Sequence, residues 1–325
     1  MTHRLNLGRR VLAFHFADLV FGLLPRKLSY LLMTVVGWVV ATCFKGRVTG
    51  LVANLRVVFP EYNETQIIDL MQRNAKNYGK FWVDLFKMPR LGLDYRRSLA
   101  VIDGQENLDR VLAQGKGCIV VTIHMGGWEG CAALWGSLKE YRSALIAEVL
   151  EPPALWRRLL TLRQSNGLEI IPLGRTAART IIRRLHENWL VAGAIDRDIV
   201  GSGKPYQFFG ATAAIPSGLV EVAQRTGAGV LPVICLREPD DTYRFVGMEP
   251  LWVGPEEGAV DATMNQLLRL FEDCIRRYPD QWHVMEPIWS APAPQAAVGP
   301  AIASEAQAPQ AAGEASVELE EANVG

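Results

Sequence analysis

Gly117-Cys-Ile-Val-Val-Thr-Ile-His-Met-Gly-Gly-Trp-Glu129 has the pattern of a buried strand that turns directly into a helix. Residues 117–123 form a short apolar run with several β-branched side chains, which is typical of a strand covered on both faces. Gly126 and Gly127 allow a tight turn after this run. A helix that follows a strand at once predicts a unit of an α/β domain.

The same alternation of strand and helix continues along the chain. Short apolar runs that predict further strands lie at residues 144–147, 168–172, 190–195 and 229–235. Stretches that predict helices lie at residues 61–88, 127–139, 152–166, 175–188, 213–227 and 262–278. We therefore expect a single α/β domain over residues 46–290, with a central mixed or parallel sheet flanked by helices.

The composition fits a folded protein with a large core. The chain has 325 residues, of which 49% are hydrophobic and 21% are charged, so a wholly disordered protein is excluded. Its formal net charge of zero excludes an obviously basic nucleic-acid-binding protein. The five cysteines are odd in number and form no Cys-x-x-Cys pair, which indicates a reduced protein without a disulfide framework or a zinc knuckle.

The charges are unevenly placed along the chain. Residues 1–60 contain eight Lys or Arg residues and a single acid, Asp18. Residues 291–325 contain five Glu residues and no Lys or Arg, and their Ala/Pro/Gln/Glu-rich composition predicts a disordered tail. A basic, apolar N-terminus is attracted to an anionic membrane surface.

Residues 1–45 are expected to form a membrane anchor. Residues 28–44 carry no charge, and as a helix they would be about 25 Å long, slightly less than a hydrocarbon core of about 30 Å. Such a segment can lie tilted in a membrane, span a thin one, or form a buried core helix. Ala-Thr-Cys at 41–43 is a poor match to a signal-peptide cleavage site. Lys45 and Arg47 favour a cytoplasmic position for the rest of the chain.

His124 and Glu129 are candidates for acid–base chemistry at the end of the first predicted strand. Ligands of open α/β sheets bind at the carboxyl ends of the strands, where His124 lies. The two glycines between these residues allow the imidazole and the carboxylate to converge. A carboxylate on one imidazole nitrogen fixes the tautomer, so that the other nitrogen can take a proton from a hydroxyl nucleophile. A structural histidine beside a helix-capping glutamate gives the same spacing without a catalytic role.

The segment His124-Met-Gly-Gly-Trp-Glu129 resembles the HxxxxD/E motif of the lysophospholipid acyltransferase superfamily. Its Gly-Trp-Glu ending is similar to the branch that acylates lipid A and phosphatidylinositol mannosides. Within residues 19–285, further stretches resemble that branch in the right order: Leu-Pro-Arg-Lys-Leu-Ser-Tyr (24–30), Ala-Asn-Leu-Arg-Val-Val-Phe-Pro (53–60), Asp-Arg-Asp (196–198), Phe-Phe-Gly (208–210), Pro-Ser-Gly (216–218) and Ala-Gln-Arg-Thr-Gly-Ala (223–228). Several motifs in one order are more specific than the single His/Glu pair.

The resemblance implies direct transfer of a fatty acyl group from a thioester carrier to a lipid hydroxyl, without a covalent acyl-enzyme. In such a reaction His124 deprotonates the acceptor and Glu129 orients His124. The tetrahedral oxyanion needs hydrogen-bond donors, for which the backbone N–H groups around Gly126 and Gly127 and the guanidinium of Arg163 are the candidates. A solvated arginine on a helix face is the alternative for Arg163.

Three acids follow predicted strands. Glu148 comes after residues 144–147, where similar relatives place a carboxylate for the acceptor or for a charge partner. Asp196 and Asp198 come after residues 190–195, so we expect them to line the same crevice, paired with arginines or bound to acceptor hydroxyls. Asp-x-Asp is also the metal-binding signature of many nucleotide-sugar glycosyltransferases, which are the rival enzyme class. That class does not explain the His/Glu pair together with the apolar N-terminus.

We expect a membrane-associated O-acyltransferase at the cytoplasmic face of the plasma (inner) membrane. The donor is acyl-CoA or acyl-carrier protein, the acceptor is a glycolipid hydroxyl, and no cofactor, metal or nucleic acid is expected. Asp-Arg-Asp and Leu-Glu-Ile-Ile-Pro-Leu (168–173) resemble the phosphatidylinositol mannoside branch more closely than the lipid A branch. A membrane protein that binds acyl lipids without turnover is a non-enzymatic alternative, against which the intact His124/Glu129 pair argues.

Overall fold

The computed structural model describes residues 2–43, 46, 48–138 and 140–289. They include nearly all of the predicted α/β domain and most of the N-terminal segment. The disordered tail that the sequence predicts over residues 291–325 lies outside the described residues.

A seven-stranded mixed sheet forms the centre of the domain. The strands are Ala100–Asp103 (β1), Cys118–Thr122 (β2), Ser143–Ala147 (β3), Glu169–Pro172 (β4), Leu190–Ala194 (β5), Gly229–Arg237 (β8) and Tyr243–Gly247 (β9). Their order is β1-β9-β8-β2-β5-β3-β4, so β2 lies in the middle. The five strands from β8 to β4 are parallel, whereas β9 runs antiparallel to β8 and β1 runs parallel to β9. A separate antiparallel hairpin consists of Lys204–Phe208 (β6) and Ala211–Ile215 (β7).

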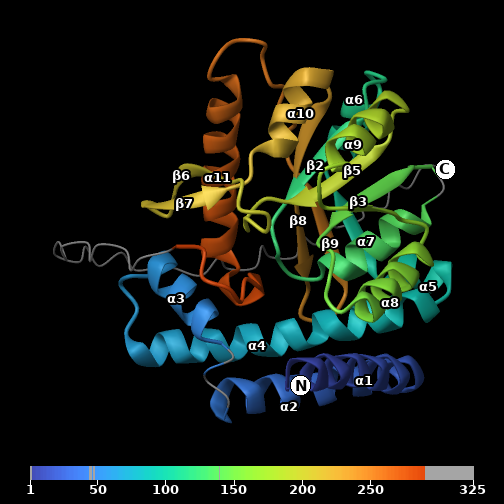
Figure 1. Ribbon diagram of the computed structural model, residues 1–325, viewed down its shortest axis with the longest axis vertical. Coiled ribbons are helices and arrows are strands. Elements are labelled where there is room, and N and C mark those ends of the chain that lie inside the picture. The colour runs from blue at the N-terminus through green and yellow to red at the C-terminus, as the bar shows by residue number, and fades with distance from the viewer. Residues whose placement is uncertain (1, 44–45, 47, 139, 290–325) are drawn as a thin grey trace, which may run out of the picture. The chain divides into compact units, whose positions relative to one another are not determined.

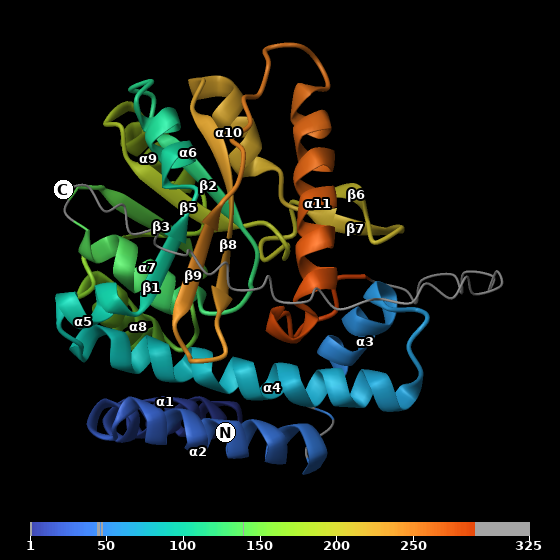
Figure 2. The same ribbon diagram turned by 180° about the vertical axis from the view of Figure 1, so that it is seen from behind.

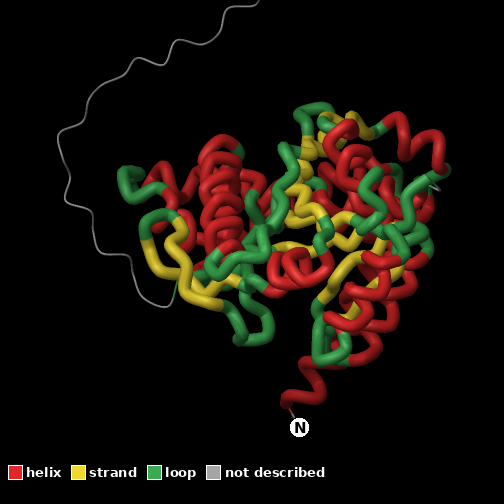
Figure 3. The backbone as a smooth tube through the Cα atoms, turned by 90° about the horizontal axis from the view of Figure 1, so that it is seen from above, coloured by secondary structure: helices red, strands yellow, loops and turns green. Residues whose placement is uncertain are grey.

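Helices cover both faces of the sheet. Side chains of the central strand β2 point alternately into two apolar clusters, one on each face. Ile119 and Val121 belong to a cluster with α9 (Ala177–His186), α10 (Gly218–Thr226) and α11 (Ala259–Arg277). Cys118 and Val120 belong to a cluster with α6 (Gln105–Leu112) and α7 (Trp128–Ser137). Figures 1 and 2 show these layers from opposite sides, and Figure 3 shows helices on both sides of the strands. Burial of both faces explains the continuous apolar run at 117–123.

The long helix α4 (Glu64–Lys87) lies across one end of the sheet (Figure 1). It begins with a capping box, in which the side chain of Asn63 accepts a hydrogen bond from the N–H of Gln66 and the reverse bond is also formed. A buried ion pair between Asp84 of α4 and Arg237 of β8 ties the helix to the sheet. The remaining short helices are α3 (Thr49–Val58), α5 (Leu93–Ser98), α8 (Pro153–Gln164) and the 3-10 helices η2 (Met88–Arg90) and η3 (Pro279–Gln281).

Two N-terminal helices, α1 (Thr2–Leu23) and α2 (Arg26–Cys43), pack against α4 on the side away from the sheet (Figures 1 and 2). Small residues allow α2 and α4 to approach closely. A Cβ on Gly79 of α4, for example, would lie 2.7 Å from the carbonyl oxygen of Met33. One face of α2 therefore packs closely against α4.

The opposite surface of these two helices is apolar and exposed. It consists of large side chains at helical spacing, which we call the α1–α2 apolar face: Leu12, Phe16, Leu19, Leu23, Leu28, Leu31, Leu32, Val35, Val36 and Trp38. Within the part of the chain that the structure describes, no helix combines the length and the apolar character that a membrane crossing requires. The predicted N-terminal membrane helix is thus not confirmed.

The fold class predicted from the sequence is confirmed. Each of the five predicted strands is present, as β2, β3, β4, β5 and β8. The helix predicted over 213–227 begins only at Gly218, because residues 211–215 form β7, which buries alternate side chains in the manner of a strand. Strands β1, β6 and β9 are short, carry polar residues and were not predicted.

Candidate active site

The turn between β2 and α7 carries His124 and is built around glycine. Gly126 has a φ of +61°, and a Cβ there would lie 2.0 Å from the carbonyl oxygen of Cys235. The N–H of Gly126 donates to the carbonyl of Gln281 (2.7 Å), so it is already used within the protein. A Cβ on Gly127 would lie 2.4 Å from the ring of Tyr243. The structure therefore gives both glycines a packing role and engages the N–H of Gly126 within the protein, whereas the oxyanion-binding role expected of Gly127 stays a prediction.

Asp196 holds the imidazole of His124. The parallel register pairs Thr122 of β2 with Ala194 of β5, so the residues two positions further along each strand lie side by side. His124 Nδ1 is 2.7 Å from Asp196 Oδ1, and the backbone N–H of His124 donates to Oδ2 (2.9 Å). The indole N–H of Trp282 also donates to Oδ2 (3.0 Å).

The protonation state of this pair follows from its surroundings. Burial on its own would raise the pKa of Asp196, but the His124 ring, the backbone N–H of His124 and the indole of Trp282 together lower it below its ordinary value. An ionised carboxylate only accepts hydrogen bonds, so Nδ1 of His124 carries a proton, and in the neutral imidazole the free lone pair lies on Nε2. A general base requires this state.

Glu129 pairs with Arg163 instead of His124. Its carboxylate is buried and accepts a hydrogen bond from Nε of Arg163 (2.9 Å), with Nη2 of the same guanidinium also in contact. The guanidinium lies over the ring of Trp128, 5.0 Å from its centroid. The orienting role expected of Glu129 falls to Asp196, because the parallel register places that carboxylate beside the imidazole. Arg163 is buried, so it is not the solvated helix-face arginine considered as its alternative.

A cavity of about 650 Å³ lies at the carboxyl ends of the parallel strands, next to His124. Its polar lining consists of His124, Glu148, Arg163, Arg197, Asp198, Ser202, His283 and Glu286. Apolar side chains from α4, α8 and α9 also line it, among them Tyr78, Phe81, Trp82, Leu85, Leu159 and Ile181. A cavity of this size with both kinds of lining suits an amphiphilic ligand.

The other predicted acids have separate partners around this cavity. Arg197 Nη2 is 3.1 Å from the carboxylate of Glu286 and 3.8 Å from that of Glu148. Asp198 accepts the N–H groups of Gly201 (3.0 Å) and two following residues, so it shapes the loop after β5. Asp196, by contrast, is committed to His124. The two aspartates of the Asp-Arg-Asp motif therefore bind different parts of the protein, one the imidazole of His124 and the other the loop after β5. Two carboxylates engaged in this way do not favour a shared metal ion, which the glycosyltransferase alternative requires.

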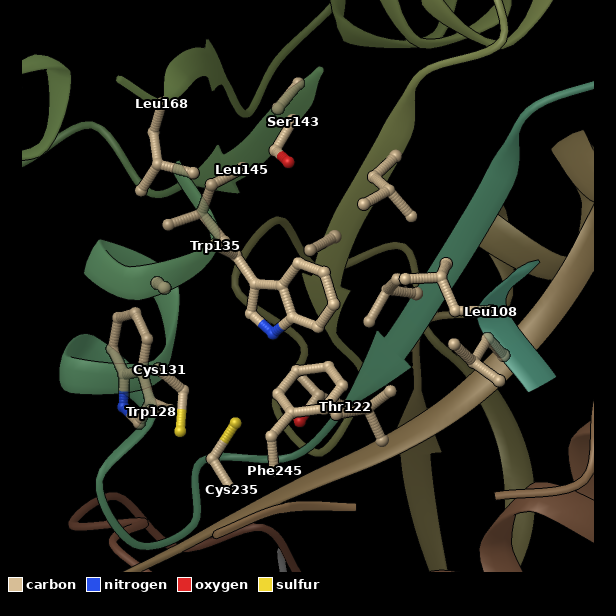
Figure 4. A pocket seen from close by; sticks show the side chains of 17 residues that line it. Leu108, Thr122, Trp128, Cys131, Trp135, Ser143, Leu145, Leu168, Cys235 and Phe245 are labelled. Carbon is tan, nitrogen blue, oxygen red and sulfur yellow. The ribbon is translucent and has the colours of Figure 1, made fainter. Parts of the chain in front are cut away.

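A second, smaller cavity of about 80 Å³ lies between α7 and the sheet (Figure 4). Its lining is almost entirely apolar and includes Trp135, Leu145, Leu168 and Phe245. Trp128 lines both this cavity and the larger one. The indole of Trp128 is therefore a shared wall between the large cavity beside His124 and the small apolar cavity beside the sheet.

Residues 8–291 match the family of bacterial lipid A biosynthesis acyltransferases. The chain belongs to this acyltransferase family. The match confirms the family that the sequence motifs indicated, and the protein is an acyltransferase.

This acyltransferase is similar to the phosphatidylinositol mannoside acyltransferase of Mycobacterium tuberculosis, with 31% identity over 234 residues, or 68% of this chain and 71% of the relative. The protein of the same name from Mycolicibacterium smegmatis is 31% identical over 229 residues, or 69% and 73% of the two chains. The lipid A biosynthesis palmitoleoyltransferase of Escherichia coli is 25% identical over 271 residues, or 80% and 84%.

Among the site residues that were not predicted from the sequence, Trp282 and His283 contact the turn after β2. Both follow η3 and return the chain to the turn that carries His124, where the N–H of His283 donates to the carbonyl of His124 (2.7 Å). The sequence signal was weak, because an adjacent tryptophan and histidine near the end of a domain do not indicate which distant segment they contact.

Proposed function

We propose that this acyltransferase is membrane-associated and moves a fatty acyl group from a thioester donor to a hydroxyl of a glycolipid. The observation that carries the proposal is the His124–Asp196 pair on the wall of a large cavity with polar and apolar lining. A base for a hydroxyl and room for an amphiphile are what the reaction requires.

His124 acts as the base through Nε2. The acceptor hydroxyl attacks the thioester carbonyl carbon while its proton moves to Nε2, and Asp196 stabilises the resulting imidazolium through Nδ1. The tetrahedral intermediate then collapses with cleavage of the carbon–sulfur bond. The imidazolium returns the proton to the departing thiolate, which leaves an ester, a free thiol and neutral His124.

Arg163 is the group we assign to the oxyanion of the intermediate. It lines the cavity, and its Nε and Nη2 atoms are held by Glu129, which fixes the plane of the guanidinium. A pre-positioned cation in a site of low dielectric stabilises developing negative charge at little reorganisation cost. Glu129 thus acts through Arg163, as a positioning residue.

A glycolipid of the phosphatidylinositol mannoside type is the acceptor that we favour. The relatives named for that lipid are 31% identical to this chain, against 25% for the lipid A enzyme. The donor is acyl-CoA or acyl-carrier protein, and its acyl chain lies along the apolar lining of the cavity. The chemistry above uses no metal or cofactor.

We propose that the α1–α2 apolar face lies on the cytoplasmic surface of the plasma membrane. The same two helices carry exposed basic residues, Arg9, Arg10 and Lys27, which favour anionic lipid. Helix α4 carries α2 on one side and lines the cavity with Tyr78 and Phe81 on another. This arrangement supports entry of lipid substrates from the bilayer beside α4, which avoids transfer of an acyl chain into water.

Incubation with palmitoyl-CoA and purified phosphatidylinositol mannosides, in the presence of a chelator, tests this function. Mass spectrometry of the lipids should show one added acyl group with the wild type and none with His124→Ala. Release of CoA should accompany the product in equal amount. A wild type that acylates neither this lipid nor a lipid A precursor, from either kind of donor, would overturn the proposal.

A further inference from the structure

His283 is buried in the site, yet one of its nitrogens has no partner. The residue is 6% exposed and lines the large cavity together with His124. Among the described residues, nothing forms a hydrogen bond with its Nε2 atom. A buried polar atom without a partner is costly, and a bound ligand that supplies the partner removes that cost.

The tautomer of His283 follows from its neighbour Asn74. The amide nitrogen of Asn74 donates to two backbone carbonyls, those of Pro279 (3.3 Å) and Trp282 (2.6 Å). Because carbonyls only accept hydrogen bonds, the amide oxygen must be the atom that faces His283 Nδ1, at 3.1 Å. Nδ1 therefore carries the proton and donates a hydrogen bond to the amide oxygen of Asn74. Nε2 is left as a bare acceptor.

The ring of His283 also stays uncharged. Burial is the main cause that lowers its pKa to about 3, and the guanidinium of Arg237 and the neighbouring His124 lower it further. An amide oxygen, unlike a carboxylate, gives little stabilisation to an imidazolium. His283 is thus unsuited to proton transfer at neutral pH, and its Nε2 atom can only accept a hydrogen bond from a ligand.

We propose that Nε2 of His283 accepts a hydrogen bond from a second hydroxyl of the acceptor headgroup, next to the hydroxyl that His124 deprotonates. The two histidines are joined by the 2.7 Å bond between their backbones, and both line the same cavity. A sugar or polyol headgroup carries neighbouring hydroxyls that can reach both rings. The thioester end of an acyl donor has no hydroxyl at its reacting carbon. The inference rests on the proposed function and makes His283 a selector for polyhydroxylated acceptors.

Two substitutions separate the two nitrogens of His283. In His283→Asn, the amide nitrogen stands near the place of Nδ1, so the bond to Asn74 is kept while the acceptor at the Nε2 position is lost. In His283→Gln, the amide reaches the Nε2 position and its oxygen restores an acceptor. His186→Asn is the matched control, because His186 is an exposed histidine at the end of α9, outside the cavity.

The probes are octyl mannoside, which carries neighbouring hydroxyls, and 1-octanol, which carries one, with palmitoyl-CoA as donor. The measured quantity is kcat/KM for octyl mannoside divided by that for octanol. We expect this ratio to fall about tenfold or more in His283→Asn, to recover in His283→Gln, and to keep the wild-type value in His186→Asn. A site that hydrogen-bonds a substrate hydroxyl rejects analogues lacking it, whereas general damage lowers both rates together.

An unchanged ratio in His283→Asn, with both rates intact or both equally reduced, would overturn the inference while leaving the proposed function in place. An equal loss for both alcohols accompanied by a higher KM for palmitoyl-CoA would assign the contact to the donor, and it would overturn the inference in the same way. Failure of the wild type to acylate any alcohol or glycolipid would instead count against the proposed function itself.

Discussion

Two histidines meet at the active site, and their partners give them different chemistry. His124 contacts a carboxylate and keeps 23% of its side chain exposed, whereas His283 contacts an amide and is buried. A carboxylate stabilises the imidazolium that forms when Nε2 takes a proton, and an amide does not. Only His124 is therefore suited to act as the base.

The neutral state of His283 predicts a pH dependence of stability. Its pKa in the folded protein is about 3, against 6.5 for an unperturbed histidine, so below pH 6.5 the unfolded chain binds a proton that the folded protein does not. The neutral ring therefore leaves the unfolding free energy at its full value above pH 6.5, and this free energy falls as the pH drops from 6.5 toward 3. Between pH 7.5 and pH 5 the wild type should lose about 2 kcal/mol of unfolding free energy that His283→Asn does not lose.

Urea unfolding of the two proteins at both pH values measures this difference directly. His186→Asn serves as the reference for an exposed histidine and should follow the wild type. If the wild type and His283→Asn lose the same unfolding free energy between the two pH values, His283 takes up its proton equally in the folded and the unfolded protein, which would contradict the prediction.

At the scale of single residues, the sequence identified His124 as a candidate base but did not identify Asp196 as the carboxylate that contacts it. Glu129 is close in sequence, and spacing arguments detect such local pairs. Asp196 lies 72 residues from His124, and only the parallel register of β2 with β5 brings the two together. The sequence placed both residues at strand ends facing one crevice, but a contact across strands needs the strand order, which periodicity does not give.

At the scale of elements, a buried ion pair joins the helix after the catalytic turn to α8. Glu129 of α7 and Arg163 of α8 are both nearly inaccessible to solvent. Removal of one member leaves the other charge buried without a partner, so Glu129→Gln and Arg163→Met should each destabilise the fold by roughly 3 kcal/mol. Replacing both should cost clearly less than the sum of the two single changes.

Chemical denaturation of the wild type, the two single variants and the double variant completes this cycle. Additive losses would indicate that the two side chains do not depend on each other. The ion pair with Glu129 would then not be what positions Arg163 for catalysis.

Elements that are buried on both sides were the ones predictable from sequence. The strand at 117–123 is a continuous apolar run, the helix at 61–88 repeats apolar side chains at helical spacing, and both are present as β2 and α4. Strand β1 is an edge strand without a fully buried side chain, and buried and half-buried side chains alternate along its neighbour β9, so neither strand forms a continuous apolar run in the sequence. The helix predicted over 213–227 began too early because Ala213 and Ala214 fit a strand as well as a helix.

At the scale of the whole molecule, the α1–α2 apolar face should control membrane binding. Leu31 is 62% exposed near the middle of this face. A charge there opposes burial at the lipid interface, so Leu31→Glu should lower partition onto phosphatidylglycerol-containing vesicles about tenfold or more. The change faces solvent in the free protein and should leave the unfolding temperature nearly unaltered.

Co-sedimentation with vesicles measures this partition, with Val101→Glu as the matched control. Val101 is 46% exposed on β1, outside the α1–α2 apolar face. It should bind vesicles like the wild type. If Leu31→Glu and Val101→Glu partition equally, the membrane surface lies elsewhere on the protein.

The most direct test of the account is the kcat of Asp196→Asn for acyl transfer from palmitoyl-CoA to a phosphatidylinositol mannoside. An asparagine would accept the N–H groups of His124 and Trp282 with its oxygen and turn an N–H toward Nδ1, which favours the tautomer without a free Nε2 lone pair. We predict a fall in kcat of about 100-fold or more, approaching that of His124→Ala, in a variant that remains folded. A folded Asp196→Asn enzyme with the wild-type kcat would contradict the account.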